Sequence, residues 1–339
     1  MDNNILLIYK LLVSLILIGL LNGLRDKISS FVGANDNPGH RKIHKFPVPL
    51  IGGVLIYCYL IVTCLLYFLV FKDNLLLDLN IFSINNLIFL NLIIFLVFFI
   101  GIIDDKFELT NVKKLFLLSV MISLICYQDK TLIPTNFEFS FDWNIVINNL
   151  SKIIIFTIII AFIISMNLFD GVNLQSGIFY LINFFFLSIY LNNINIIFIF
   201  CFPVLFFLYL NYKNKCFLGD SGSNLLSFIL IYLLIKSSLY SVSTLYFDQI
   251  ILFIFLPCLD SLRLFIYRIW VFGDPFKADM EHFHHILLRK YKFNYFILIS
   301  SCMILLPHIL FIAGINFFIS ILIITFLYSF LLFKSYQTI

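Results

Sequence analysis

The chain has 339 residues, of which 62% are hydrophobic and 12% are charged, and its formal net charge is +4. Soluble domains carry a charge on about a quarter of their residues, so this composition excludes a soluble globular protein and indicates one that crosses a membrane several times. The small positive charge gives no indication of a nucleic-acid partner.

Apolar runs close to the ~20 residues that cross a hydrocarbon core recur along the chain. We predict an all-α bundle of eleven transmembrane helices in one domain over residues 1–339, at 4–24, 49–71, 81–103, 112–127, 145–165, 175–191, 194–211, 222–240, 247–269, 293–313 and 315–334. The first run is interpreted as a retained helix, not a cleaved signal peptide, because Lys10 interrupts it and no small-residue cleavage site follows.

The distribution of positive charge predicts the orientation. With eleven crossings, the loops after the first, third, fifth, seventh and ninth helices share one side with the C-terminus. Of the 22 Lys and Arg, all fall in this set except Lys10, Lys72, Lys130, Lys152 and Lys236. Because cytoplasmic loops are enriched in Lys and Arg, we predict that these loops and the C-terminus are cytoplasmic and that the N-terminus lies outside.

Five polar segments interrupt the apolar pattern, and all belong to the predicted cytoplasmic set. In chain order they span residues 37–53, 101–110, 167–171, 217–224 and 279–285, the last with Arg289 behind it. Each segment alone is explained by an ordinary helix end or turn. Because all five lie on one side, we predict that they meet in a single cytoplasmic cleft.

The carboxylates of these segments favour a magnesium site. Asp104 and Asp105 are adjacent at the end of an apolar run, where burial of charge is costly. Asp170 and Asp220 lie beside glycines and amides, with no cysteine nearby, and such oxygen ligands suit Mg²⁺ or Mn²⁺ better than zinc. In Gly-Asp-Ser-Gly, the glycines allow a ligand close to the backbone and Ser221 offers a hydroxyl. A simple turn between two helices is the alternative for this tetrapeptide.

Asn167 and Asp170 are three residues apart at the end of a predicted helix, so they share one face if the helix continues. An amide with a carboxylate can complete a set of oxygen ligands, or bind a sugar or a base. Gly171 would end the helix, and helix capping is the alternative.

Two loops offer hydrogen-bond donors and positive charge for an anion such as a diphosphate. The candidate residues are Arg41, Lys42, His44, Lys45, His282, His284, His285 and Arg289. The His-Glu-x-x-His pattern of zinc proteases is absent. The charge bias between the two sides explains the Lys and Arg but not four histidines in two loops. Metal-binding carboxylates and cationic donors at a bilayer surface are the groups needed for phosphoryl transfer, and the membrane suggests a lipid phosphate as one substrate.

At these residues the chain resembles the polyprenyl-phosphate N-acetylhexosamine-1-phosphate transferases, the part of glycosyltransferase family 4 that includes the WecA, TagO and MraY enzymes. The matching segments, in the family's order, are Arg-Lys-Ile-His-Lys with Pro-Leu-Ile-Gly-Gly, Gly-Ile-Ile-Asp-Asp, Asn-Leu-Phe-Asp-Gly, Leu-Gly-Asp-Ser-Gly-Ser, Pro-Cys-Leu-Asp-Ser-Leu-Arg and His-Phe-His-His. The resemblance implies a bundle of membrane helices with a cytoplasmic active site. It also implies transfer of a sugar 1-phosphate from a UDP-activated amino sugar to a polyprenyl phosphate, with release of UMP.

By this resemblance, Asp220 would hold Mg²⁺ across the donor's diphosphate, with Asn167 as a second ligand. Asp104 and Asp105 would position or deprotonate the attacking lipid phosphate, and which of them does which stays open. The implied substrate-binding residues are Lys42, His44, Lys45, Asp170, Ser221, His282, His284, His285 and Arg289. The acceptor would be undecaprenyl phosphate, and the location the inner membrane of a bacterium. The resemblance leaves open whether the chain acts alone or as a homodimer.

Departures from the family pattern bear on the donor. Glu108 stands where some members have the third acid of Asp-Asp-x-x-Asp, and Pro-Val-Pro-Leu-Ile-Gly-Gly replaces Thr-Pro-Thr-Met-Gly-Gly of the MraY branch. These differences favour the WecA-like branch, with UDP-N-acetylglucosamine as donor for a lipid-linked cell-surface polysaccharide such as an O-antigen or a teichoic acid. Another UDP-N-acetylhexosamine or a phospho-MurNAc-pentapeptide donor is the alternative. A membrane transporter is the non-enzymatic alternative, although transporters place their charges near the bilayer midplane.

Overall fold

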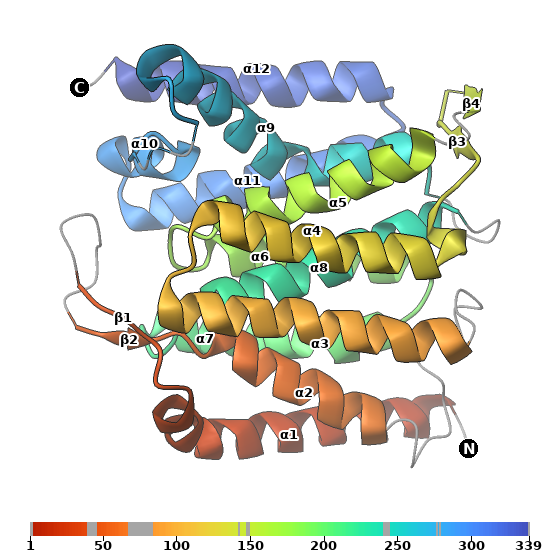
Figure 1. The fold of residues 1–339 in the computed structure, drawn as a ribbon, viewed down its shortest axis with the longest axis vertical. Coiled ribbons are helices and arrows are strands. Elements are labelled where there is room, and N and C mark those ends of the chain that lie inside the picture. Colours follow the sequence, from red (N-terminus) through yellow and green to blue (C-terminus); the bar gives the residue numbers. More distant parts are fainter. Residues whose placement is uncertain are drawn as a thin grey trace.

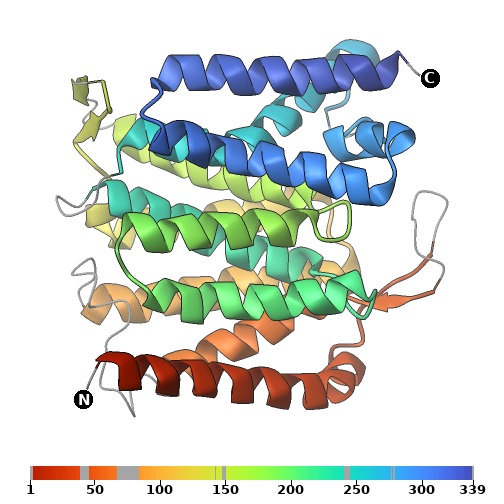
Figure 2. The ribbon, with the colours of Figure 1, turned by 180° about the vertical axis from the view of Figure 1, so that it is seen from behind.

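A computed structural model describes residues 3–38, 46–66, 84–141, 143–146, 150–239, 245–275, 277 and 279–337. Its helices lie side by side in a bundle (Figure 1). The first helix begins at one end of this bundle and the last helix ends at the other, which the view from behind also shows (Figure 2).

The described helices follow one another with short connections. They are α1 (Asn3–Val32), α2 (Gly52–Leu66), α3 (Ile84–Phe107), α4 (Asn111–Gln128), the 3-10 turn η2 (Lys130–Leu132), α5 (Leu150–Phe169), α6 (Gln175–Tyr190), the π-helix η3 (Ile197–Cys201), α7 (Phe202–Tyr212), α8 (Gly219–Ser238), α9 (Phe247–Phe272), α10 (Phe283–Lys290), α11 (Phe293–Ile312) and α12 (Phe317–Tyr336). Two antiparallel hairpins complete the fold, β1 (Asn35–Asp36) with β2 (Val48–Pro49) and β3 (Asn136–Glu138) with β4 (Asn144–Val146).

Each apolar run predicted from the sequence coincides with one of these helices, the run at 194–211 being η3 continued by α7. Among the described residues, eight helices are long and apolar enough to cross a membrane: α1, α3, α4, α5, α8, α9, α11 and α12. The others, α2, α6 and η3 with α7, are shorter apolar helices. The all-α membrane bundle is therefore confirmed. The count of eleven crossings, the orientation of the termini and the single domain stay predictions.

Helix α8 lies at the centre of the bundle, and every residue from Ser221 to Ser237 is buried. It packs against α2, α3, α5, α6 and α9. Glycines allow close approach at its first turn: a Cβ added at Gly53 of α2 would lie 2.2 Å from the Gly222 nitrogen, and one at Gly101 of α3 would lie 2.4 Å from Ser221 Cα. The glycines of the first two polar segments thus fit directly against the fourth.

A buried ion pair joins the far end of α8 to the segment after α4. Lys236 Nζ lies 2.7 Å from the Asp129 carboxylate, and these side chains are 0% and 1% exposed. The Tyr232 hydroxyl and the Thr131 backbone and hydroxyl also donate to this carboxylate. Charges this deeply buried remain ionised only when partners of this kind replace water.

Candidate active site

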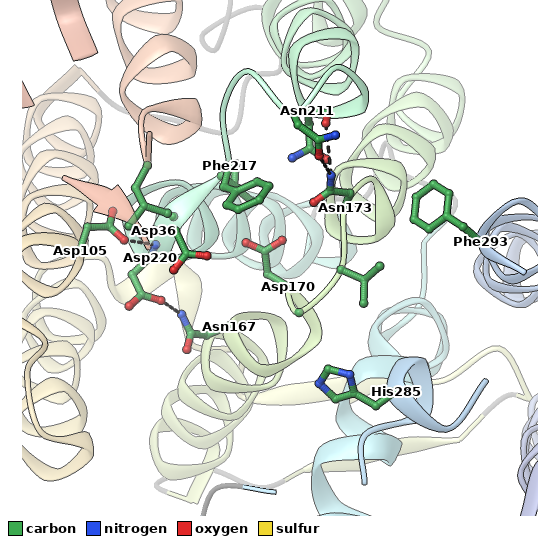
Figure 3. Close-up of a pocket in the computed structure, with 16 residues that line it drawn as sticks. Asp36, Asp105, Asn167, Asp170, Asn173, Asn211, Phe217, Asp220, His285 and Phe293 are labelled. Atoms are coloured by element: carbon green, nitrogen blue, oxygen red, sulfur yellow. Dashed lines mark hydrogen bonds between the residues drawn. The ribbon is translucent and has the colours of Figure 1, made fainter. Parts of the chain in front are cut away.

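A cavity of about 420 Å³ lies at the end of the bundle that carries the β1–β2 hairpin (Figures 1 and 3). All five polar segments contribute to its lining, which includes Leu50, Asp105, Asn167, Asp170, Phe217, Asp220 and His285. The prediction that these segments meet is therefore confirmed for the residues that the structure describes. Lys42, His44 and Lys45 lie outside the described residues.

A lysine links two of the predicted carboxylates. Lys114 of α4 places its Nζ 2.7 Å from Asp104 Oδ2 and 3.0 Å from Asp220 Oδ1. The Asn167 amide at the end of α5 donates to the same Asp220 oxygen, and Asp104 also accepts a hydrogen bond from the Leu109 backbone N–H. Four side chains from four helices thus surround one position at the edge of the cavity. Lys114 was missed in the sequence because it resembles any other positive charge of a cytoplasmic loop.

The neighbouring carboxylate, Asp105, has a different role. Its two oxygens accept hydrogen bonds from the backbone N–H groups of Asp220 (2.7 Å) and Ser221 (3.0 Å), so it caps the N-terminus of α8. Such groups lack partners within the helix, and a carboxylate there is favoured by the helix dipole. Gly219 has φ +75°, and a Cβ there would lie 2.6 Å from Asp105 Oδ2. Asp105 therefore fixes the position of Asp220. Ser221 participates through its backbone, and its hydroxyl is buried without a hydrogen-bond partner.

Asp170 follows α5 and lies in the cavity wall, where it accepts a hydrogen bond from the Ser176 hydroxyl. Burial raises the pKa of the Asp170 carboxyl to about 8; the Ser176 hydrogen bond opposes this shift, whereas the carboxylates of Asp220 and Asp105 reinforce it. At neutral pH this carboxyl is mostly protonated. It can therefore donate a hydrogen bond to a ligand without adding negative charge to an acidic site.

Amide side chains that the sequence analysis did not single out organise the opposite wall. Asn211 accepts a hydrogen bond from the Leu174 backbone N–H (2.7 Å) and donates to the Cys216 carbonyl (3.0 Å). It thereby joins the loop after α5 to the loop before α8. Asn173 and Asn214 are hydrogen bonded to each other across the same gap. Only the fold brings these loops together, so no sequence spacing indicated them.

The histidine loop is held by an aspartate of the Pro-Cys-Leu-Asp-Ser-Leu-Arg segment. Asp260 of α9 places Oδ2 3.1 Å from His282 Nδ1 and also accepts hydrogen bonds from Arg263 and Tyr328. The other ring nitrogen of His282 lies 3.3 Å from Arg268 Nη2. Both nitrogens of His282 therefore have protein partners, so its contacts order the loop. Direct binding of a diphosphate by His282 stays a prediction that these contacts do not support.

The other two histidines lie nearer the cavity. His284 is buried against Gly171, and His285 lines the cavity itself. Burial lowers the pKa of both imidazoles, and the charge of neighbouring histidines acts in the same direction. Each is therefore neutral at pH 7 and acts as a hydrogen-bonding group. Arg289 bonds to Glu281 and to the Met280 carbonyl, so its predicted contact with substrate also stays untested.

Replacing Gly171 with alanine should disturb the cavity wall, because the added Cβ would lie 2.4 Å from His284 Nε2. We expect reduced activity and a loss of about 1–3 kcal/mol in stability, as is typical of overpacking. Gly19→Ala in α1 is the matched control, since nothing lies within 4 Å of a Cβ there. Thermal unfolding in detergent and turnover measure the two effects. Equal behaviour of both variants would contradict the proposed contact.

Comparisons with known proteins agree with the resemblance seen in the sequence. Residues 87–238 match the family described as glycosyl transferase family 4, a range that contains Asp104, Asp105, Asn167, Asp170 and Asp220. The chain belongs to this family.

Several curated proteins named undecaprenyl-phosphate alpha-N-acetylglucosaminyl 1-phosphate transferase are similar over most of the chain. The protein of Escherichia coli O157:H7 is 24% identical over 323 residues, which cover 91% of this chain and 84% of the relative. Those of Salmonella typhi and Haemophilus influenzae are each 23% identical and cover 78% and 77% of this chain, or 72% and 74% of their own lengths.

Proposed function

We propose that the protein transfers N-acetylglucosamine 1-phosphate from UDP-N-acetylglucosamine to undecaprenyl phosphate in the inner membrane of a bacterium. The products are UMP and the first lipid-linked intermediate of a cell-surface polysaccharide. The names of the similar proteins support this reaction. The observation that carries it is the arrangement in which Lys114 joins Asp104 and Asp220 at the edge of a cavity in a membrane bundle. A lipid phosphate and a soluble nucleotide can both reach such a position.

In the proposed reaction an oxygen of the lipid phosphate forms a bond to the phosphorus that carries the sugar. The bond from that phosphorus to the bridging oxygen breaks, and UMP leaves with the bridging oxygen. Phosphoryl transfer of this kind depends on positioning and on neutralisation of charge. Lys114 supplies positive charge between the carboxylates, and Asp104 orients the attacking phosphate. A phosphate monoester has its second pKa near about 6, so little proton removal is needed.

The side chains at this position fit Mg²⁺. Within the described residues, no group of three His, Cys, Asp or Glu gathers around one point. Mg²⁺ nevertheless takes one or two carboxylates from a protein and completes its shell with water and substrate phosphates. Asp220 provides such a carboxylate, and the Asn167 amide beside it can present either its nitrogen or its oxygen. When bound, the ion would add positive charge at the donor's diphosphate. Mn²⁺ is the alternative metal.

The cavity walls suggest how the nucleotide is placed. The ring of Phe217 lines the cavity and offers a face for a base (Figure 3). Asn173 and Asn214 provide amide groups on the same side, and the protonated Asp170 carboxyl lies between this wall and Asp220 (Figure 3). In this arrangement the base lies against the loop wall and the diphosphate lies toward α8. The remaining volume receives the sugar.

Incubation of purified protein with Mg²⁺, undecaprenyl phosphate and one UDP-sugar at a time tests this proposal. We expect UMP release and a lipid-linked product with UDP-N-acetylglucosamine, and much less with its 4-epimer, because a site that bonds one hydroxyl rejects the epimer that leaves its groups unpaired. Release with UDP-N-acetylgalactosamine alone would overturn the donor but keep the reaction. Folded protein that releases no UMP with any UDP-amino sugar would overturn the reaction, and uptake of intact UDP-sugar into vesicles would indicate a transporter.

A further inference from the structure

The end of the bundle opposite the active-site cavity carries the β3–β4 hairpin (Figure 1). Its strands pair from Asn136 with Val146 to Glu138 with Asn144, and the Phe139 N–H donates to the Trp143 carbonyl. These bonds satisfy much of the hairpin backbone internally, which is what an apolar surrounding requires.

The hairpin is fastened to the bundle. The ring of Phe137 lies 4.1 Å from that of Phe247 at the start of α9. The Ser140 N–H and hydroxyl both donate to the carboxylate of Asp248, at 3.0 and 2.6 Å. The hairpin therefore holds a fixed position relative to the helices, and its exposed side chains are presented in a fixed direction.

The side chains it presents are aromatic and apolar. Phe141 lies between Trp143 and Phe318 of α12, with ring centroids 5.3 and 5.2 Å away. Trp143 is 61% exposed and Phe318 is 52% exposed, and Ile145 and Val146 of β4 are exposed as well. We call these five residues the aromatic surface. In water such a surface would be unfavourable, and clusters of this kind mark sites of contact with another phase or molecule.

The aromatic surface is continuous with apolar surface that the candidate membrane spans expose. Along α12, Phe318 is followed by exposed Ile319, Leu322 and Phe326, and α5 begins with exposed Leu150 and Ile153. Lys152, in the first turn of α5, is also exposed at this level. A lysine at the end of a span extends its ammonium toward lipid phosphates.

We propose that the aromatic surface lies in the headgroup and glycerol region of the bilayer leaflet at this end of the protein, and that it anchors the hairpin there. Tryptophan is enriched in this region because its ring is apolar and its N–H needs a polar partner. The occupant of the surface is thus phospholipid. Through the contacts of Phe137 and Ser140, the anchor sets the depth of the start of α9, the helix that carries Asp260 at the other end.

The chain contains two tryptophans, so each can be studied alone. Trp270→Phe removes a side chain that is 89% exposed at the end of α9 and leaves Trp143 as the only indole. The variant is reconstituted into phosphatidylcholine vesicles with bromine either near the ester end or near the tail end of the acyl chains. We expect loss of Trp143 emission mainly with bromine near the ester end, blue-shifted emission in unbrominated vesicles, and little quenching by acrylamide.

Two outcomes would overturn the proposal. Strong quenching by acrylamide without quenching by brominated lipid would place Trp143 in water. Protection from both quenchers would mean that protein, such as a second copy of the chain, covers it. The reciprocal variant Trp143→Phe reports on Trp270 in the same vesicles and verifies that the quenchers are effective. Adding Phe141→Ser to Trp270→Phe should shift Trp143 emission toward that of an indole in water, and an unchanged spectrum would also contradict the proposal.

Discussion

Replacing Asp220 with asparagine is expected to abolish sugar-phosphate transfer while the bundle remains folded. The substitution removes one negative charge from the position that Lys114 and Asn167 share. A metal at a diphosphate contributes several kcal/mol to the transition state, and its loss corresponds to roughly a thousandfold or more in rate. Asparagine has nearly the same shape as aspartate, and the backbone N–H groups that Asp105 caps are unaffected. UMP release and thermal unfolding in detergent measure the two effects separately.

Asp26→Asn is the matched control for this experiment. Asp26 lies on α1 with its side chain 84% exposed and pairs with the adjacent Arg25. Its replacement removes the same charge far from the cavity and should leave turnover unchanged. Normal turnover of folded Asp220→Asn, or full activity of the native protein in excess chelator, would exclude a metal held by Asp220 from the mechanism.

Removing the buried carboxylate of Asp129 should have the largest effect on stability. Asp129→Ala leaves Lys236 buried without its charge partner. Breaking one side of a buried ion pair typically costs about 3–5 kcal/mol. We expect the unfolding free energy in detergent to fall by this amount. The double variant Asp129→Leu with Lys236→Met should recover much of the loss, because replacing both charges leaves neither unpaired.

The exposed pair Arg25–Asp26 again provides the control, since Asp26→Ala should change stability little. Equal stability of Asp129→Ala and the native protein would contradict the structural role of the pair. A double variant that is no more stable than Asp129→Ala would show that packing, and not charge, dominates at this position.

The same ion pair predicts a dependence of stability on pH. Burial alone would raise the pKa of the Asp129 carboxyl, but hydrogen bonds from Lys236, Thr131 and Tyr232 outweigh it and the pKa is lowered. A carboxyl with a lowered pKa in the folded state stabilises the protein above its unfolded pKa, near about 4. This contribution is lost as the pH falls through the folded pKa. Asp129→Asn should remove that part of the acid sensitivity.

The sequence was sufficient to predict the class of fold and the gathering of the polar segments, because both follow from where apolar runs end. It did not separate the roles of adjacent residues. Asp104 and Asp105 look equivalent in sequence, yet one contacts Lys114 and the other caps α8. That difference depends on which way each side chain points at the end of α3, and hence on packing between α3 and α8.

The histidine loop shows the same limit. Three nearby histidines suggested three ligands for a diphosphate, but contacts with Asp260 and Arg268 occupy both nitrogens of His282. Asp260 lies 22 residues earlier in the chain. Its position in a matching segment was visible, but its partner was not, because the contact arises only when α9 lies beside α10.

The central position of α8 bears on how the chain enters the membrane during translation. Four of the helices that enclose it, α2, α3, α5 and α6, are synthesised first. With α4, α8 is the least apolar of the eight candidate spans in the described residues, since it begins with Gly-Asp-Ser-Gly and carries Lys236 in its last turn. Helices already in the bilayer offer α8 a carboxylate for that lysine and glycines for its first turn. Because Asp220 arrives with α8, the nascent chain acquires its reactive centre only late in biogenesis.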